Sequence, residues 1–245
     1  LLLENGANVN AQGGDYGNAL HAASIEGHKG IVRLLLEAGA DVNLRGGYHY
    51  GTPLQAASHS GHKEIVKMLL EKGADVSAQG GLYNTALQAA CYGGNKEIVQ
   101  LLLERGADVN AQEGYYGNAL QVASSADRKE IVQLLLSKGA QVNAQGGHLG
   151  NALQAAAFGS HEGVVQLLLE SGADVNAQGG KYGNALQAAC YQGHKGVVQL
   201  LLEGGADVNA QGGKYGNALQ AASYEGHQQV VELLLERGAD VNAKG

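Results

Sequence analysis

A segment reading Asn-Ala-Leu-Gln-Ala-Ala, or a close variant of it, recurs along this chain at a nearly constant spacing. Its copies begin at Asn18, Thr52, Thr85, Asn118, Asn151, Asn184 and Asn217, which lie 33 residues apart except for one interval of 34. A unit of this length cannot bury its apolar face alone, so neighbouring units stack and share one elongated core. The period therefore predicts a repeat solenoid.

The unit over 179–211 shows how each repeat is expected to fold. Asn184 is a suitable N-cap, and Gln187 can reach back to it as in a capping box, as Gln55 can to Thr52 and Gln88 to Thr85. The expected order is a first helix over 185–191, a break at Gly193, a second helix from about Lys195 and a left-handed turn at Gly205. The second helix is apolar on more than one face, so neighbouring repeats must cover it on two sides.

These residues resemble the ankyrin-repeat pattern over the whole chain. The resemblance rests on Gly193-His194, Val197-Val198, Leu200 to Leu202, Gly205 to Asn209 and Thr52-Pro53-Leu54. It implies an all-α fold of stacked helix-turn-helix units with hairpin-like tips. The family's His after the opening Leu survives only as His21 and is Gln in the other repeats. This variant of the pattern is similar to the ankyrin arrays of large fungal NACHT-type proteins, which carry a nucleotide-binding signalling domain.

The unbroken period predicts a single domain over 1–245. It comprises a partial repeat, 1–12, and full repeats 13–45, 46–79, 80–112, 113–145, 146–178, 179–211 and 212–244. Neither end carries a visibly polar terminal repeat, so we expect a fragment of a longer array. Leu1 to Leu3 and the Val230 to Leu235 helix are expected to leave apolar surface that favours end-to-end self-association.

Composition excludes several classes of partner. The net charge of -7, without a clustered basic face, argues against nucleic acid. No apolar stretch approaches the roughly 20 residues of a membrane-spanning helix.

Cys91 and Cys190 share one column three repeats apart, roughly 30 Å in a helix stack, so they are expected to be reduced packing residues. An intracellular, cytoplasmic location follows as an expectation.

No residue pattern predicts catalysis, a cofactor or a metal. One column holds His28, His62, His161, His194 and His227. Its members are about 10 Å apart in a stack of helices, whereas zinc ligands must lie within about 2.1 Å of one point. The Gly-Gly tips lack the Lys-Ser or Lys-Thr of a phosphate loop, and no cysteine or serine has a recognisable paired base. We therefore expect a chain that is not an enzyme.

All 11 Tyr and the single Phe fall in three columns outside the core. The tip column is Tyr16, Tyr50, Tyr83, Tyr116, Leu149, Tyr182 and Tyr215; a structural ladder of rings is favoured there, with direct recognition as the alternative. The second column, Asp15, Tyr48 or His49, Leu82, Tyr115, His148, Lys181 and Lys214, varies strongly. Such variation is expected where a surface contacts a specific partner.

The third column ends the first helix, at Ile25, His59, Tyr92, Ser125, Phe158, Tyr191 and Tyr224. Because Ser125 and His59 occupy it too, the fold does not require a ring there. Recognition is thus favoured over shielding of the core. The adjoining column, which includes Gln192 and Glu225, varies as well.

The sequence thus predicts a protein-interaction module that binds a protein or peptide on its concave face. The residues expected to bind the partner are Tyr48, His59, Tyr92, Tyr115, Phe158, Lys181, Tyr182, Tyr191, Gln192, Lys214, Tyr215, Tyr224 and Glu225. Lys181 and Lys214 either meet an acidic stretch of the partner or are simply solvated. Two other functions remain open: a passive spacer, and a targeting appendage of a multidomain enzyme.

One repeat, 113–145, departs from the pattern and is expected to be the weakest interior link. It has Asp127 where Gly27, Gly61 and Gly94 stand in earlier repeats. It also has Gln141 in place of Asp, and Val122 in a column of Ala. A residue other than glycine held at positive φ costs about 1 kcal/mol.

Overall fold

The computed structural model describes residues 8–47, 50–112 and 114–243. Tyr48, His49 and Leu1 to Leu3, which the sequence analysis singled out, lie outside them. The chain divides into two compact units, residues 1–109 and 110–245, here called the N-terminal and C-terminal units. Each unit is described by itself.

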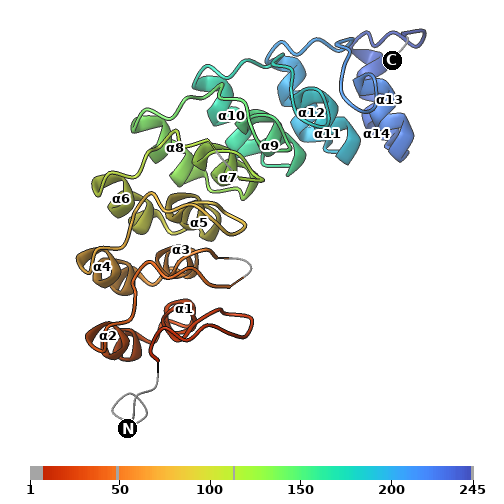
Figure 1. The fold of residues 1–245 in the computed structure, drawn as a ribbon. Helices are drawn as coiled ribbons and strands as arrows, with labels where there is room; N and C mark the ends of the chain where they lie inside the picture. Colours follow the sequence, from red (N-terminus) through yellow and green to blue (C-terminus); the bar gives the residue numbers. More distant parts are fainter. Residues whose placement is uncertain (1–7, 48–49, 113, 244–245) are drawn as a thin grey trace. The chain divides into compact units, whose positions relative to one another are not determined.

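Both units are built from helix pairs, one pair in each repeat (Figure 1). The N-terminal unit contains α1 (Ala19–Ile25), α2 (Lys29–Glu37), α3 (Pro53–Ser60), α4 (Lys63–Glu71), α5 (Ala86–Gly93) and α6 (Lys96–Glu104). The C-terminal unit contains α7 (Ala119–Ser125), α8 (Lys129–Ser137), α9 (Ala152–Phe158), α10 (Glu162–Glu170), α11 (Ala185–Gln192), α12 (Lys195–Glu203), α13 (Ala218–Glu225) and α14 (Gln228–Glu236). Within each unit first helices pack on first helices and second helices on second helices. The predicted all-α solenoid is confirmed.

The helices begin and end where the local chemistry predicts. Asn184 has an extended backbone, and its side chain accepts the backbone N–H of Gln187, while the Gln187 side chain accepts the N–H of Asn184. The same capping box forms at Thr52, Thr85 and Asn118. Gly193 ends α11 at φ 75°, and an added Cβ there would lie 2.5 Å from the His227 ring. Glycine is thus required by both the backbone and the close neighbour.

Small residues on the first helices and a branched pair on the second helices form the core. Ala188, Ala189 and Cys190 of α11 are fully buried, which lets α9 and α13 approach closely. On the second helices α4, α6, α8, α10 and α12, the two residues in the positions of Val197 and Val198 are buried together with one Leu, such as Leu201. Both cysteines are free and buried, and burial raises the pKa of each thiol. They act as packing residues, as predicted.

Four buried glutamines of the first helices bond to the next repeat, and three of them, Gln55, Gln121 and Gln187, also close the capping box of their own helix. The Gln187 side-chain amide lies 3.0 Å from the carbonyl oxygens of Gly212 and Gly216 in the following tip. Gln154 and Gln121 make the same contacts one and two repeats earlier, and Gln55 bonds to the following tip in the N-terminal unit. These glutamines are 2–3% exposed, so the bonds are shielded from water. They fix each tip to the helix behind it.

A second set of bonds between repeats runs along the loops after the second helices. The Asn176 side-chain amide donates to the carbonyl of Gly205 at 3.1 Å, and its oxygen accepts the backbone N–H of Asp207 at 2.8 Å. Asn10, Asn43, Asn110, Asn143 and Asn209 make the equivalent bonds. Ser77 occupies this column in the third repeat, and a serine hydroxyl is too short to copy both bonds.

We predict that Ser77→Asn stabilises the chain by up to about 1 kcal/mol, because one amide side chain adds hydrogen bonds between neighbouring repeats. The reverse change, Asn176→Ser, should destabilise by a similar amount. Urea unfolding midpoints of the two variants and the parent chain measure both effects. An unchanged or lower midpoint for Ser77→Asn would refute this role of the column.

Three residues other than glycine have positive φ in the described part of the chain: Asn84, at 64° in a tip, and Asp127 and Ser160 at the turn between the two helices, where strain was expected at Asp127 alone. Asp127 has φ 57°, as predicted, and Ser160 in the next repeat has φ 63° at the same position. The sequence already showed a serine in this glycine column, but the prediction considered Asp127 alone. Gln141 keeps the bond to Asn110, yet lacks the short carboxylate with which Asp174 accepts the N–H of Asn176.

We therefore expect Ser160→Gly to stabilise the chain by up to about 1 kcal/mol and Gly193→Ser to destabilise it by more, since the latter also meets His227. Hydrogen exchange should show earlier opening at 120–135 and 157–162 than in repeat 179–211. Uniform protection across these segments, or a destabilised Ser160→Gly variant, would count against strain at this turn.

The last helix leaves part of its apolar surface exposed. Val230, Leu233 and Leu234 of α14 are buried against α12 and α13, Val231 is half-buried, and Leu235 is 44% exposed. In α2, Ile31 and Leu34 are 49% and 63% exposed. End-to-end association stays a prediction.

Candidate functional site

The rings of the tip column and of the helix-end column interleave into one stack in the C-terminal unit. In order along the repeats its members, here called the C-terminal ring ladder, are Phe158, Tyr182, Tyr191, Tyr215 and Tyr224. Successive ring centroids lie 5.1, 5.0, 4.7 and 5.3 Å apart. These separations lie within the range of favourable aromatic pairs. Repeats 179–211 and 212–244 thus contribute two rungs each, one from the tip and one from the helix end, and repeat 146–178 contributes Phe158 alone.

The ladder changes from buried to exposed along its length. Tyr182 is 6% exposed and forms part of the core, whereas Tyr224 at the end of α13 is 72% exposed. Phe158, Tyr191 and Tyr215 lie half-buried between them. Hydrogen bonding with Tyr215, with smaller contributions from burial and Glu225, raises the pKa of Tyr191. The Tyr191 phenol is therefore neutral at physiological pH, and its ring offers an apolar face with a hydroxyl edge.

A shorter stack lies in the N-terminal unit. Tyr50, His59, Tyr83 and Tyr92 alternate in the same way, with consecutive centroids 5.0, 5.2 and 4.8 Å apart. The Tyr50 hydroxyl also lies 3.1 Å from Nδ1 of His59. The tip rings of both units stack from repeat to repeat, Tyr50 on Tyr83 and Tyr182 on Tyr215, which confirms the predicted ladder for these pairs.

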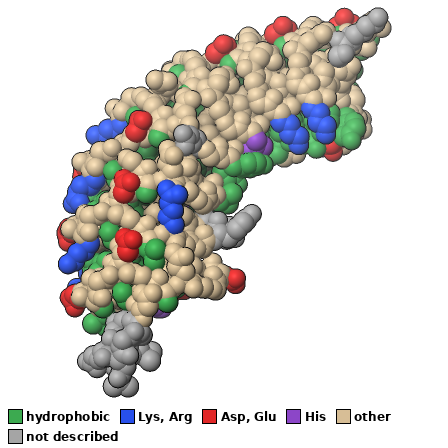
Figure 2. All heavy atoms as spheres, in the orientation of Figure 1, with side chains coloured by type: hydrophobic (Ala, Val, Ile, Leu, Met, Phe, Trp, Pro, Cys, Tyr) green, Lys and Arg blue, Asp and Glu red, His purple; other side chains and the backbone are tan. Residues whose placement is uncertain are grey.

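Backbone hydrogen bonds link successive tips of the C-terminal unit. The N–H of His148 donates to the carbonyl of Tyr115, that of Lys181 to His148, and that of Lys214 to Lys181, at 3.0–3.1 Å. The side chains of this column therefore follow one another closely, and the His148 ring stacks on Tyr115 at 4.2 Å. Nζ of Lys181 and of Lys214 each lie 5.2 Å from the centroid of the adjoining ring, Tyr182 or Tyr215. Figure 2 shows two basic side chains side by side next to hydrophobic ones on this unit.

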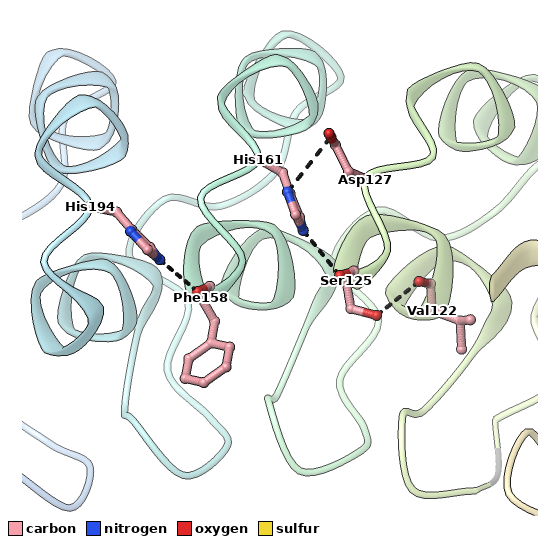
Figure 3. Close-up of polar contacts among 6 residues, drawn as sticks. All are labelled: Val122, Ser125, Asp127, Phe158, His161 and His194. Atoms are coloured by element: carbon pink, nitrogen blue, oxygen red, sulfur yellow. Dashed lines mark hydrogen bonds and ion pairs between the residues drawn. The ribbon is translucent and has the colours of Figure 1, made fainter. Parts of the chain in front are cut away.

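The histidine column fixes the backbone at the helix-end rungs. His194 donates from Nε2 to the carbonyl of Phe158 at 3.0 Å, and His161 donates to that of Ser125 at the same distance (Figure 3). His227 bonds the Tyr191 carbonyl at 2.9 Å in the same way. Each histidine therefore ties the ring-bearing end of one helix to the repeat that follows. The sequence pattern did not predict these bonds, since the column was considered there only for a metal site.

The structure brings together most of the predicted binding residues. In the C-terminal unit, Lys181 and Lys214 border the ring ladder on the tip side, while Gln192 and Glu225 end α11 and α13 beside it. Tyr115, 56% exposed, stacks instead with His148 and Tyr116. His59 and Tyr92 belong to the N-terminal stack. Their role in binding stays a prediction.

Four ring residues stack on predicted binding residues but were not themselves predicted to bind: Tyr50, Tyr83, Tyr116 and His148. The signal that could have found them is the pairing of the columns, because a tip ring always stands nine residues before a helix-end residue, as Tyr182 does before Tyr191.

In residues 8–47, 50–112 and 114–243, no group of three or more His, Cys, Asp or Glu side chains is placed to hold a metal ion. None of the helices there has both the length and the apolar character that crossing a bilayer requires.

We predict that the chain loses stability as the pH falls below about 6.5. Burial is the largest cause that lowers the pKa of His21, His59, His148 and His194. Near pH 6 the folded chain therefore binds fewer protons than the unfolded chain. The free energy of unfolding is highest above the histidine pKa of the unfolded chain and decreases as the pH falls below that value.

Urea midpoints between pH 7.5 and 5.5 test this, with His21→Gln as the matched variant, since Gln fills that column in every other repeat. The variant should show a shallower decline. If the urea midpoint of the parent chain does not change with pH over this range, the buried histidine rings do not resist protonation.

Comparisons with known proteins agree with this architecture. The family model described as ankyrin repeats (3 copies) matches residues 1–80, 79–146 and 152–245. A crystal structure of the human ASB11 ankyrin repeat domain superposes with a TM-score of 0.78 at 29% identity, over 91% of this chain and 99% of that one. Azaphilone pigments biosynthesis cluster protein L of Monascus ruber is 65% identical over 34 residues, which are 14% of this chain and 7% of that protein. The chain belongs to the ankyrin repeat family.

Proposed function

We propose that this chain is a non-catalytic interaction module that binds a protein or peptide on the face made by its tips and first-helix ends. Ankyrin repeats generally bind proteins and are typically non-catalytic. The single observation that carries the proposal here is the C-terminal ring ladder, which ends in the exposed ring of Tyr224. Aromatic side chains supply stiff contact area and dominate binding hot spots.

The ladder is suited to recognition because its rings are held before a partner arrives. Tyr191 is stacked between Tyr182 and Tyr215, and its carbonyl is bonded to His227. Little side-chain freedom remains to be lost on binding, which lowers the cost of association. The net charge of -7 disfavours a nucleic-acid backbone as the ligand of the chain as a whole.

A small-molecule ligand is less well supported than a protein. A hollow of about 370 Å³ lies between α2 and α4, lined by Lys29, Arg33, Glu64 and Lys67 among others. Its charges partly neutralise one another, since Glu64 lies 3.0 Å from Lys67 and 3.6 Å from Lys29. It is on the side of the second helices, away from the rings. A protein partner can instead use the whole length of the ladder.

We further propose that the array works as part of a larger protein, of the fungal NACHT type that its sequence resembles. The similarity to a Monascus ruber protein, of which the matched segment is only 7%, supports an array carried in a longer chain. Sequencing the flanking regions of the gene tests this part.

The experiment that tests the binding face uses Tyr224→Ser, because a ring that is 72% exposed can be removed with little effect on folding. Against a partner isolated from the source cell, we expect at least tenfold weaker binding, about 1.4 kcal/mol. The matched control is Leu235→Ser, which removes another exposed apolar side chain from α14. Combined replacement of Phe158, Tyr191 and Tyr224 should weaken binding further.

Unchanged affinity of both the single and the combined variant, with helix content retained, would refute the proposed face. A chain that captures no partner from its own cell under any condition would instead favour the passive spacer.

A further inference from the structure

The C-terminal ring ladder advances from one repeat to the next by about the length of two residues of an extended polypeptide. The tip rings of Tyr182 and Tyr215 are 6.3 Å apart and 12° from parallel. Tyr191 is offset from the line between them, 5.0 Å from Tyr182 and 4.7 Å from Tyr215. A β-strand rises 3.2–3.4 Å per residue and a polyproline II chain 3.1 Å. Two residues of an extended segment therefore span one repeat of the ladder, one for its tip ring and one for its helix-end ring.

The rungs differ in chemistry in an alternating way. Each tip ring has an ammonium group 5.2 Å from its centroid, from Lys181 at Tyr182 and from Lys214 at Tyr215. The helix-end rungs, Tyr191 and Tyr224, have no such cation among the residues that the structure describes. The surface thus alternates between a cation on a ring and a bare ring, in the order Lys181, Tyr191, Lys214, Tyr224.

The two ammonium groups are held close together without a counter-ion. The N–H of Lys214 donates to the carbonyl of Lys181 at 3.1 Å, so the two backbones run as close as neighbouring strands, which are about 4.8 Å apart. Across residues 8–47, 50–112 and 114–243, neither ammonium has a carboxylate within 4 Å. In a chain of net charge -7, this is a local site for negative charge.

The opposite margin of the ladder repels negative charge. Glu225 follows Tyr224 at the end of α13, is exposed, and interacts with the Tyr191 hydroxyl. Carboxylates of a bound segment are therefore drawn to the tip side and disfavoured on the helix-end side. Since alternate side chains of an extended chain point to opposite sides, acidic residues two apart would all face the lysines.

We infer that the C-terminal ring ladder binds an extended acidic segment in which Asp or Glu alternates with an apolar or aromatic residue. Its acidic side chains pair with Lys181 and Lys214, and its apolar side chains lie on Tyr191 and Tyr224. This deepens, and rests on, the proposed protein-binding function. The recognised feature is the two-residue spacing of the charges rather than their number.

A pair of labelled synthetic peptides tests the register. One contains Glu-Phe-Glu-Phe and the other Glu-Glu-Phe-Phe, in the same Gly-Ser context, so charge and composition are equal. We expect the alternating peptide to bind the chain at least about fivefold more tightly by fluorescence anisotropy, with a preference that declines as salt rises. Inorganic phosphate at millimolar concentration should not compete.

Two double variants identify the groups responsible. Lys181→Gln with Lys214→Gln should abolish the preference, so that both peptides bind equally. The control, Lys129→Gln with Lys195→Gln, removes the same charge from exposed positions at the start of α8 and α12 and should leave the preference intact.

Equal binding of the two peptides by the parent chain, or no binding of the alternating peptide up to about 1 mM, overturns the inference. So does competition by phosphate, which would indicate a general anion site. If both peptides bind equally and Tyr224→Ser weakens both, the proposed function stands and only the register fails. If both bind and Tyr224→Ser weakens neither, the ring face is not the binding surface, and the proposed function fails as well.

Discussion

A buried glutamine side chain that bonds in two directions is the interaction on which each tip depends. Gln187 closes the capping box of its own helix with Asn184 and donates to the carbonyls of Gly212 and Gly216 in the next tip. A tip rich in glycine has little tendency to hold one conformation by itself. The glutamine supplies the missing constraint, and burial makes its loss costly because the carbonyls would be left without donors.

The C-terminal ring ladder follows from two such constraints acting on its two columns. Glutamines hold the tips, and the histidines of the next repeat hold the helix ends through the carbonyls of Phe158 and Tyr191. With both backbones fixed, the rings of Tyr182, Tyr191 and Tyr215 interleave at 4.7–5.0 Å. The advance of 6.3 Å per repeat, on which the proposed match to an extended peptide rests, is thus set by hydrogen bonds that lie behind the rings. A solenoid can therefore change its partner by changing ring and tip residues while these bonds stay constant.

Much of the fold could be predicted from the sequence, because the features concerned are local. The α11 helix begins at Ala185 and ends by Gly193 as expected, since the N-cap, the capping glutamine and the left-handed glycine lie within a few residues of one another. The ladder of tip rings was predictable for a similar reason, as equivalent residues of stacked repeats must be neighbours.

The remainder depends on contacts that no short pattern encodes. The sequence identifies Gln187 as a capping residue. Its bonds to Gly212 and Gly216, 25 and 29 residues away, cannot be predicted without knowing where the next tip lies. Tyr182 and Tyr191 stand in separate columns, and only the packed helix shows that their rings meet. The sequence also did not show which apolar residues of α14 are buried, as Val230, Leu233 and Leu234 are, and which is exposed, as Leu235 is, because burial depends on how the helix is turned.

The central claim is that the buried glutamines hold the tips, and thereby the rings, in register. Hydrogen exchange of Gln187→Met tests it most directly, since Met keeps the volume and removes both sets of bonds. If the glutamine holds the tip, residues 212–217 exchange faster in the variant and the ring resonances of Tyr191 and Tyr215 are perturbed, while α12 stays protected. Unchanged exchange at 212–217, or a uniform loss of protection across the whole C-terminal unit, would contradict it.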